Sequence, residues 1–178
     1  MKIGIQRSVL LTVLLAAAAC GIAQDGHPAE WRVASDAELR SVIPPRAPVV
    51  RERIETEMRS ASGITNGHGK YIAGVVLITA GYSAEGKYSH FFLTQVPLKV
   101  GSDTRLAPGE YLLGYDRNEN NNALLVHFYE AATGHLVGSV PATLMTGVTR
   151  VEAFRIWPPG ERSAIQIGRF GFGYQIGS

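Results

Sequence analysis

The sequence has very little cysteine and almost no excess of charge. Cys20 is the only cysteine in 178 residues, so no internal disulfide can form. Lysine and arginine total 17 against 15 aspartate and glutamate residues, and two of the cations, Lys2 and Arg7, lie at the N-terminus. The rest of the chain therefore carries equal numbers of cations and acids and lacks the basic footprint of proteins that bind a phosphate backbone. We expect no nucleic-acid partner.

The sequence also offers no obvious transmembrane helix at its start. Val9 to Ala19 is an apolar run that is too short to span a bilayer but is typical of the core of a signal peptide. Lys2 and Arg7 supply the positive segment that precedes such a core. The pattern predicts export to the periplasm or the exterior.

Two ways of processing this segment remain open. Small residues at Gly21 and Ala23 predict cleavage after Ala23, which makes residues 1–23 a signal peptide. Ala17 to Gly21 is also similar to a bacterial lipobox, and in that case residues 1–19 are removed and Cys20 is lipidated. A lipid on Cys20 would be the only expected membrane attachment.

Residues 24–62 are predicted to be a leader followed by one or two helices. Ser35-Asp36-Ala37-Glu38 has the order of a capping box, so a short helix is expected to start there and to end before Pro44. Val50, Ile54 and Met58 recur every four residues, which predicts a second, one-sided helix from Pro48 to about Ser60.

Beyond Gly63 the pattern changes to short apolar runs that are separated by turn residues, and it predicts a β domain over residues 63–178. The expected strands are Tyr71–Thr79, Tyr88–Val96, Leu98–Val100, Glu110–Tyr115, Leu124–Glu130, Leu136–Val140, Val151–Trp157, Ala164–Ile167 and Phe170–Ile176. No helical segment alternates with these strands, which argues against a parallel sheet. The expected fold class is mainly β, an antiparallel sandwich or small barrel of about seven to nine strands.

One predicted hairpin carries a family resemblance. Leu106-Ala107-Pro108-Gly109-Glu110-Tyr111, followed across a turn by Leu124 to Glu130, resembles a turn-and-strand segment of uncharacterised exported bacterial β-domain proteins. The resemblance implies an extracytoplasmic all-β module and transfers no catalytic residue.

Two loops imitate binding motifs without completing them. Gly81 to Lys87 matches part of a phosphate-binding loop, but Tyr88 stands where serine or threonine is required and a strand follows where a helix is required. Asp116, Asn118 and Asn120 have the spacing of a calcium loop, which lacks its glycine and its final glutamate here. We therefore expect no cofactor.

The histidines are the best candidates for catalysis. None of them forms a metal-binding pair such as H-x-H or H-E-x-x-H, so no metal site is expected. His127 and His135 flank a predicted hairpin turn close to Glu130, and His90 lies in the predicted strand Tyr88–Val96. A small envelope enzyme that uses His90, His127, His135 and Glu130 as acid, base or metal groups is the alternative function.

The aromatic residues favour a different class of function. Tyr111, Tyr115, Tyr129 and Trp157 lie on predicted strands, where aromatic side chains can line a barrel mouth or a sheet face. We expect a non-catalytic, exported cell-envelope module that either has a structural role or binds a protein or small molecule, and these four residues are the candidate ligand contacts.

Overall fold

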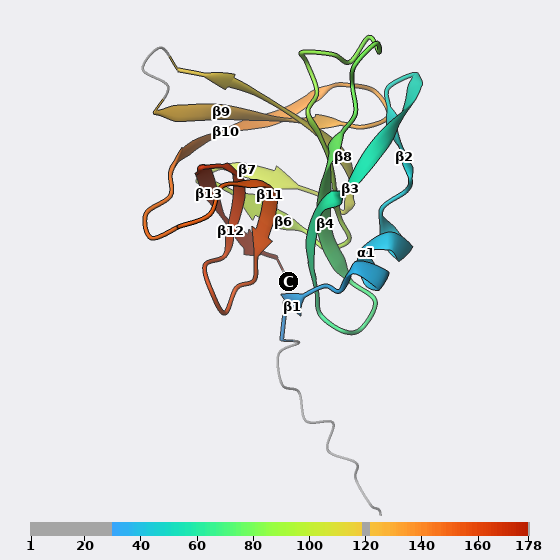
Figure 1. The fold of residues 1–178 in the computed structure, drawn as a ribbon. Coiled ribbons are helices and arrows are strands. Elements are labelled where there is room, and N and C mark those ends of the chain that lie inside the picture. Colours follow the sequence, from blue (N-terminus) through green and yellow to red (C-terminus); the bar gives the residue numbers. More distant parts are fainter. Residues whose placement is uncertain (1–29, 119–121, 178) are drawn as a thin grey trace, which may run out of the picture.

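The structure, a computed structural model, describes residues 30–118 and 122–177. The predicted signal peptide, Ala23 and Cys20 lie outside the described residues. The described residues form one helix and thirteen strands, and every strand pairing is antiparallel (Figure 1). The elements are β1 (Arg32–Val33), α1 (Asp36–Val42), β2 (Arg46–Val49), β3 (Glu52–Thr65), β4 (Tyr71–Leu77), β5 (His90–Thr94), β6 (Leu98–Val100), β7 (Thr104–Leu106), β8 (Gly109–Arg117), β9 (Ala123–Glu130), β10 (Leu136–Leu144), β11 (Glu152–Trp157), β12 (Ala164–Gly168) and β13 (Phe170–Ile176).

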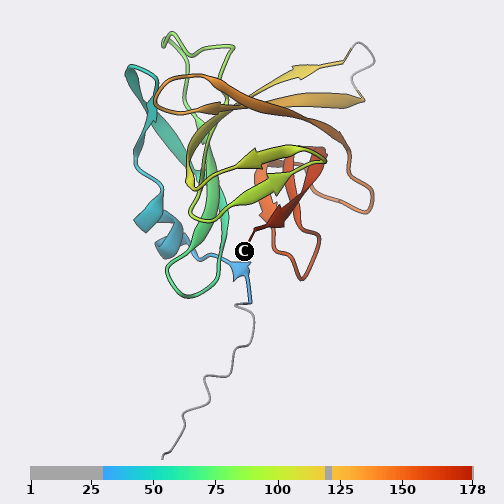
Figure 2. The same cartoon turned by 180° about the vertical axis from the view of Figure 1, so that it is seen from behind.

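The strands curl into a nearly closed barrel in the order β1-β3-β4-β5-β8-β9-β10-β13-β12-β11. Strands β10 and β13 share only two residue pairs, Thr143 with Gly171 and Leu144 with Phe170, and diverge from there. The β6–β7 hairpin fills the space between them, with β6 paired to β13 and β7 close to β10 (Figure 2). This hairpin closes one end of the barrel.

The barrel has a seam where β11 meets β3 and β4. No backbone ladder joins these strands, and the backbone N–H of Ile156 instead donates to Ser62 Oγ at 2.9 Å. Gly74 permits the close approach, because a Cβ atom there would lie 2.5 Å from the ring of Phe154. Side chains therefore close the barrel where the backbone ladder stops.

Successive side chains along the strands point to opposite faces of the sheet, and the apolar ones form two layers. Inward-facing residues, such as Phe92, Phe128 and Phe172, fill the barrel and stack edge to face at 5.9 Å. Outward-facing residues of β4, β5 and β8 are covered by α1, by β2 and by the loop between β4 and β5. The second layer makes one outer face of the barrel as apolar as its interior.

The predicted first helix is confirmed. α1 begins after Ser35, whose hydroxyl accepts from the backbone N–H of Glu38, and the Glu38 carboxylate accepts from the N–H of Ser35. Arg32 adds a bidentate ion pair to Glu38 and holds the pKa of that carboxyl at about 2. This helix is too short and too polar to cross a membrane, and no other helix occurs in the described ranges.

The predicted helix from Pro48 to Ser60 is wrong. This segment contains the end of β2, a turn at Val50 and Arg51, and most of β3. A spacing of four residues places Val50, Ile54 and Met58 on one face of a helix, but an even spacing also places residues on one face of a strand. Ile54 is fully buried against the cover formed by β2, and Glu55 forms its ion pair with Arg46 across the hairpin at 3.2 Å.

The mainly β, antiparallel character is confirmed, but the expected number of strands is too small. All nine predicted strands overlap β4, β5, β6 and β8 to β13. The four missed strands are β2 and β3, which lie mostly in the segment mistaken for a helix, and β1 and β7, which are two and three residues long. Such short strands carry no recognisable period.

Candidate functional site at the open end of the barrel

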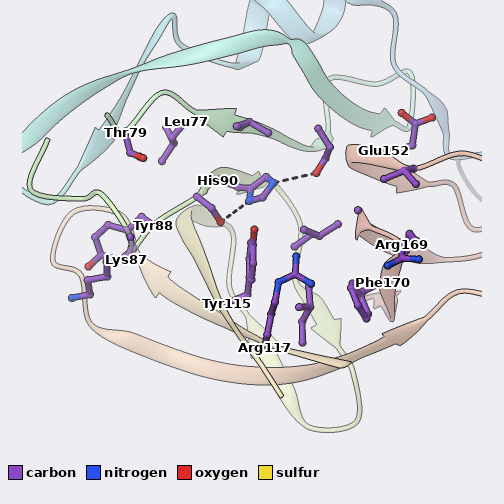
Figure 3. Close-up of a pocket in the computed structure, with 18 residues that line it drawn as sticks. Leu77, Thr79, Lys87, Tyr88, His90, Tyr115, Arg117, Glu152, Arg169 and Phe170 are labelled. Atoms are coloured by element: carbon purple, nitrogen blue, oxygen red, sulfur yellow. Dashed lines mark hydrogen bonds between the residues drawn. The ribbon is translucent and has the colours of Figure 1, made fainter. Parts of the chain in front are cut away.

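The end of the barrel opposite the β6–β7 hairpin contains a cavity of about 770 Å³. Its walls come from the ends of β4, β8 and β12, the starts of β5, β9, β11 and β13, and the loop before β5 (Figure 3). The lining residues are Val76, Leu77, Thr79, Gly86, Lys87, Tyr88, Ser89, His90, Tyr115, Arg117, Leu124, Val151, Glu152, Ala153, Ile167, Gly168, Arg169 and Phe170.

Strand β8 shows how the sequence builds this cavity. Tyr111, Leu113, Tyr115 and Arg117 alternate along the strand and face the barrel interior in turn. The first two are buried in the core, whereas Tyr115 is 36% exposed and Arg117 lies at the rim. One face of a single strand thus passes from apolar core to aromatic wall to cationic rim.

His90 lies at the inner end of the cavity and is 4% exposed. Its Nε2 lies 3.3 Å from the carbonyl oxygen of Ala153 on β11, and its Nδ1 lies 2.8 Å from Ser89 Oγ. A carbonyl can only accept, so Nε2 carries the proton and Nδ1 accepts from the hydroxyl. Burial lowers the pKa of His90 to about 4, which leaves the ring uncharged at neutral pH.

The charged groups at the rim are not equally available to a ligand. The carboxylate of Glu152 lies 3.4 Å from Arg150 Nε and 3.7 Å from an Arg155 guanidinium nitrogen, so its charge is already compensated. The Lys87 ammonium lies over the ring of Tyr88, 4.9 Å from its centroid, and does not point into the cavity. Arg117 and Arg169 remain as the cationic groups of the opening.

Arg117 lies between two aromatic walls. Its guanidinium carbon is 6.0 Å from the ring centroid of Tyr115 and 5.7 Å from that of Phe170. Figure 3 shows the Tyr115 hydroxyl and the Arg117 guanidinium pointing the same way, toward the space below His90. Within residues 30–118 and 122–177, neither Arg117 nor Arg169 forms an ion pair.

Of the four aromatic candidates, only Tyr115 lines the cavity. Tyr111 is buried in the core, where its hydroxyl donates to the carbonyl of Ala107 at 2.7 Å. Tyr129 lies on the outer face and packs edge-on against Tyr88. Trp157 donates from Nε1 to Gln166 and carries the Arg155 guanidinium 3.7 Å from its ring centroid.

The four catalytic candidates do not come together. His90 faces the interior, whereas His127 lies on the outer face of β9. His135 is exposed after the β9–β10 turn, and the exposed Glu130 carboxylate accepts from the Thr133 hydroxyl. The structure thus separates the proposed acid and base groups into an interior site, an outer face and a turn.

His127 does belong to a different polar chain. Its Nε2 lies 3.0 Å from Asp116 Oδ2, and its Nδ1 lies 2.7 Å from Ser139 Oγ. A carboxylate accepts only, so Nε2–H donates to Asp116 and the Ser139 hydroxyl donates to Nδ1. These three side chains lie on β8, β9 and β10, on the outer face of the sheet, and none of them lines the cavity.

Sequence reasoning missed the residues that define the opening, namely Arg117, Arg169, Leu124 and Phe170. Arg117 carried a usable signal, because it follows Tyr115 by two residues and therefore shares its face of the strand. Arg169 and Phe170 lie at the turn between β12 and β13, and nothing in their local pattern distinguishes a rim from an ordinary turn.

The described part of the chain contains no cluster of three or more His, Cys, Asp or Glu side chains that could hold a metal ion. Comparisons with protein-family models, with curated protein sequences and with solved structures found no match. The functional argument therefore depends on the site itself.

Proposed function

We propose that this protein is an exported, non-catalytic module that binds a small molecule in the cavity at the open end of its barrel. The observation that carries this proposal is the cavity of about 770 Å³, whose lining combines apolar side chains such as Leu124 and Ile167 with polar and charged ones in about equal share. Ligand sites commonly have volumes of about 300–1,000 Å³, and the mouths of β-barrels are among their preferred places.

The state of His90 supports binding rather than catalysis. A general acid or base works best when its pKa lies near the working pH, and burial holds the pKa of His90 at about 4. Both ring nitrogens are already engaged, one with the Ala153 carbonyl and one with Ser89. The imidazole thus connects β5 to β11 and has no nitrogen free for a ligand.

Native mass spectrometry tests the proposal on the full-length gene product, expressed in a bacterial host and gently extracted. We expect a retained small molecule in the wild-type protein and its loss in Val76→Trp, which fills the cavity beside His90. Val137→Trp, at an exposed position of β10, is the matched control and should keep the adduct. An adduct that survives Val76→Trp in a folded protein, or no adduct in any of the three, would contradict the proposal.

The same spectra test export. A mass that begins at Gln24 supports cleavage after Ala23 and a free periplasmic or secreted protein. A diacylated or triacylated chain that begins at Cys20 supports a membrane-anchored lipoprotein. An unprocessed chain that retains Met1 to Ala23 would contradict export.

A second candidate function is ester hydrolysis by the polar chain of Asp116, His127 and Ser139. The spacing supports it, because His127 is positioned to take the proton of the Ser139 hydroxyl while Asp116 holds the ring. The test is labelling with a fluorophosphonate probe, which should modify wild-type protein but not Ser139→Ala or His127→Ala. Absence of labelling in the wild type would leave the chain a structural link between three strands.

A further inference from the structure

The charges around the opening specify the class of ligand. We infer that the cavity binds an amphipathic organic anion whose carboxylate is held by Arg117 and Arg169 and whose apolar body fills the barrel mouth. This inference rests on the proposed function, since it names the ligand of the same site. It goes further because a neutral or cationic ligand would satisfy the proposed function and contradict the inference.

Some charged groups at the rim already have a partner within the protein. Arg150 and Arg155 neutralise Glu152, and the Lys87 ammonium lies over outward-facing aromatic rings. Among the described residues, the opening therefore has an excess of positive charge that comes from the two arginines. A guanidinium presents paired donors that match the two oxygens of a carboxylate.

The surroundings of Arg117 strengthen a charged contact there. Tyr115 and Phe170 flank the exposed guanidinium, whose carbon lies 6.0 and 5.7 Å from their ring centroids. Phe170 is itself 3% exposed, so this wall is held in place by the core. Attraction between the cation and the two rings restrains the guanidinium, so less freedom is lost when it binds an anion.

The apolar part of the cavity wall indicates an apolar body. Leu124, Ile167 and Phe170 line it from three neighbouring parts of the barrel, and each is almost fully buried. His90 adds an uncharged ring whose nitrogens are occupied. Every buried side-chain polar atom in the described residues already has a hydrogen-bond partner, so the buried part of the wall holds no unpaired polar group for a ligand.

Isothermal titration calorimetry with decanoate and decan-1-ol, at concentrations below micelle formation, tests this inference. The two probes share an apolar chain of the same length and differ in the charge of the head. We expect decanoate to bind wild-type protein at least tenfold more tightly than decanol, a difference of about 1.4 kcal/mol. The affinity for decanoate should also fall as the salt concentration rises.

Two variants place the head group. Arg117→Gln should weaken decanoate binding about tenfold and leave decanol binding unchanged, because glutamine keeps a polar side chain and removes the charge. Arg51→Gln, in the exposed turn between β2 and β3, makes the same change away from the cavity and should alter neither affinity. Methyl NMR signals of Leu124 and Ile167 should shift when decanoate binds.

The outcomes separate the inference from the proposed function. If decanol binds as tightly as decanoate, shifts both methyl signals and is indifferent to Arg117→Gln, the anionic class is wrong and the binding cavity stands. If decanoate binding depends on Arg117 while Leu124 and Ile167 do not shift, the apolar body is wrong. If neither probe binds or shifts these methyl groups, the inference is wrong, whereas the proposed function is decided by the adduct in the native mass spectra.

Discussion

The two ends of the barrel use the same strands in opposite ways. At the closed end, the β6–β7 hairpin inserts Leu98, Val100 and Leu106 into the interior, where each is at most 2% exposed. At the open end none of the described residues forms a hairpin that enters the barrel, and the inward positions of β8 become Tyr115 and Arg117. The comparison indicates that side chains at the closed end stabilise the fold, while side chains at the open end leave room for a ligand.

The different roles of the two ends can be tested by truncating one inward side chain at each end. Leu106→Ala should lower the free energy of unfolding by about 3 kcal/mol, because it leaves a void in a packed core. Tyr115→Ala, at a partly exposed position, should cost less than about 1 kcal/mol. Urea denaturation followed by circular dichroism measures both values, and equal losses at the two ends would contradict the division of roles.

The next largest effect is expected from acid, through His90. Its pKa is about 4 in the fold and about 6.5 when unfolded, so the unfolded chain binds the proton more readily between these values. The contribution of His90 to the free energy of unfolding is therefore fully present above about pH 6.5. It falls as the pH is lowered, by about 2 kcal/mol at pH 5. Urea titrations at pH 7.5, 6 and 5 check this dependence.

The choice of pH range separates the effect of His90 from that of the carboxyls. The carboxyls of Glu38 and Glu57, whose pKa values arginines lower to about 2, affect stability only below their unfolded pKa near 4.5. His90→Gln should abolish most of the change between pH 7.5 and 5, whereas the exposed His68→Gln should keep it. A slope unaffected by His90→Gln would show that another group is responsible.

A smaller effect is expected at Gly114, which holds the loop beside the cavity. A Cβ atom there would lie 2.2 Å from the backbone oxygen of Lys87, so Gly114→Ala must push this loop away from β8. The expected cost is about 1–2 kcal/mol, together with weaker decanoate binding. Gly173→Ala is the control, because its nearest neighbour, Ser163 O, would be at an ordinary 3.8 Å. If Gly114→Ala binds decanoate with unchanged affinity, the position of this loop does not affect binding.

Much of the fold could be predicted because most strands carry their own signal. Leu98–Val100 and Phe170–Ile176 were predicted with the observed bounds, since turn residues flank apolar residues there. The long β3 could not be, because its mixed polar sequence repeats every four residues and suits both helix and strand. β3 pairs with β2 and β4 and contacts β11, and these neighbours, not its own residue pattern, determine that it is a strand.

Less of the site than of the fold could be predicted from the sequence. Tyr115 and His90 were recognised by residue type, but for different roles, and the sequence did not indicate that they share a cavity. Arg117 and Arg169 come from segments more than 50 residues apart, and only the closure of the barrel brings them to one opening. The order of the strands in the sheet determines which strand ends lie around the same opening. Local residue patterns in one sequence do not reveal this order.

The seam also has a consequence for the order in which the chain folds. Ser62 and Ile156 are 94 residues apart, so the contact that closes the barrel must wait until nearly the whole chain has been synthesised. Contacts of such long separation form slowly. Until β11 arrives, Ile64 of β3 and Ile72 of β4 lack part of their apolar cover, and uncovered apolar side chains make a partly folded chain prone to aggregate.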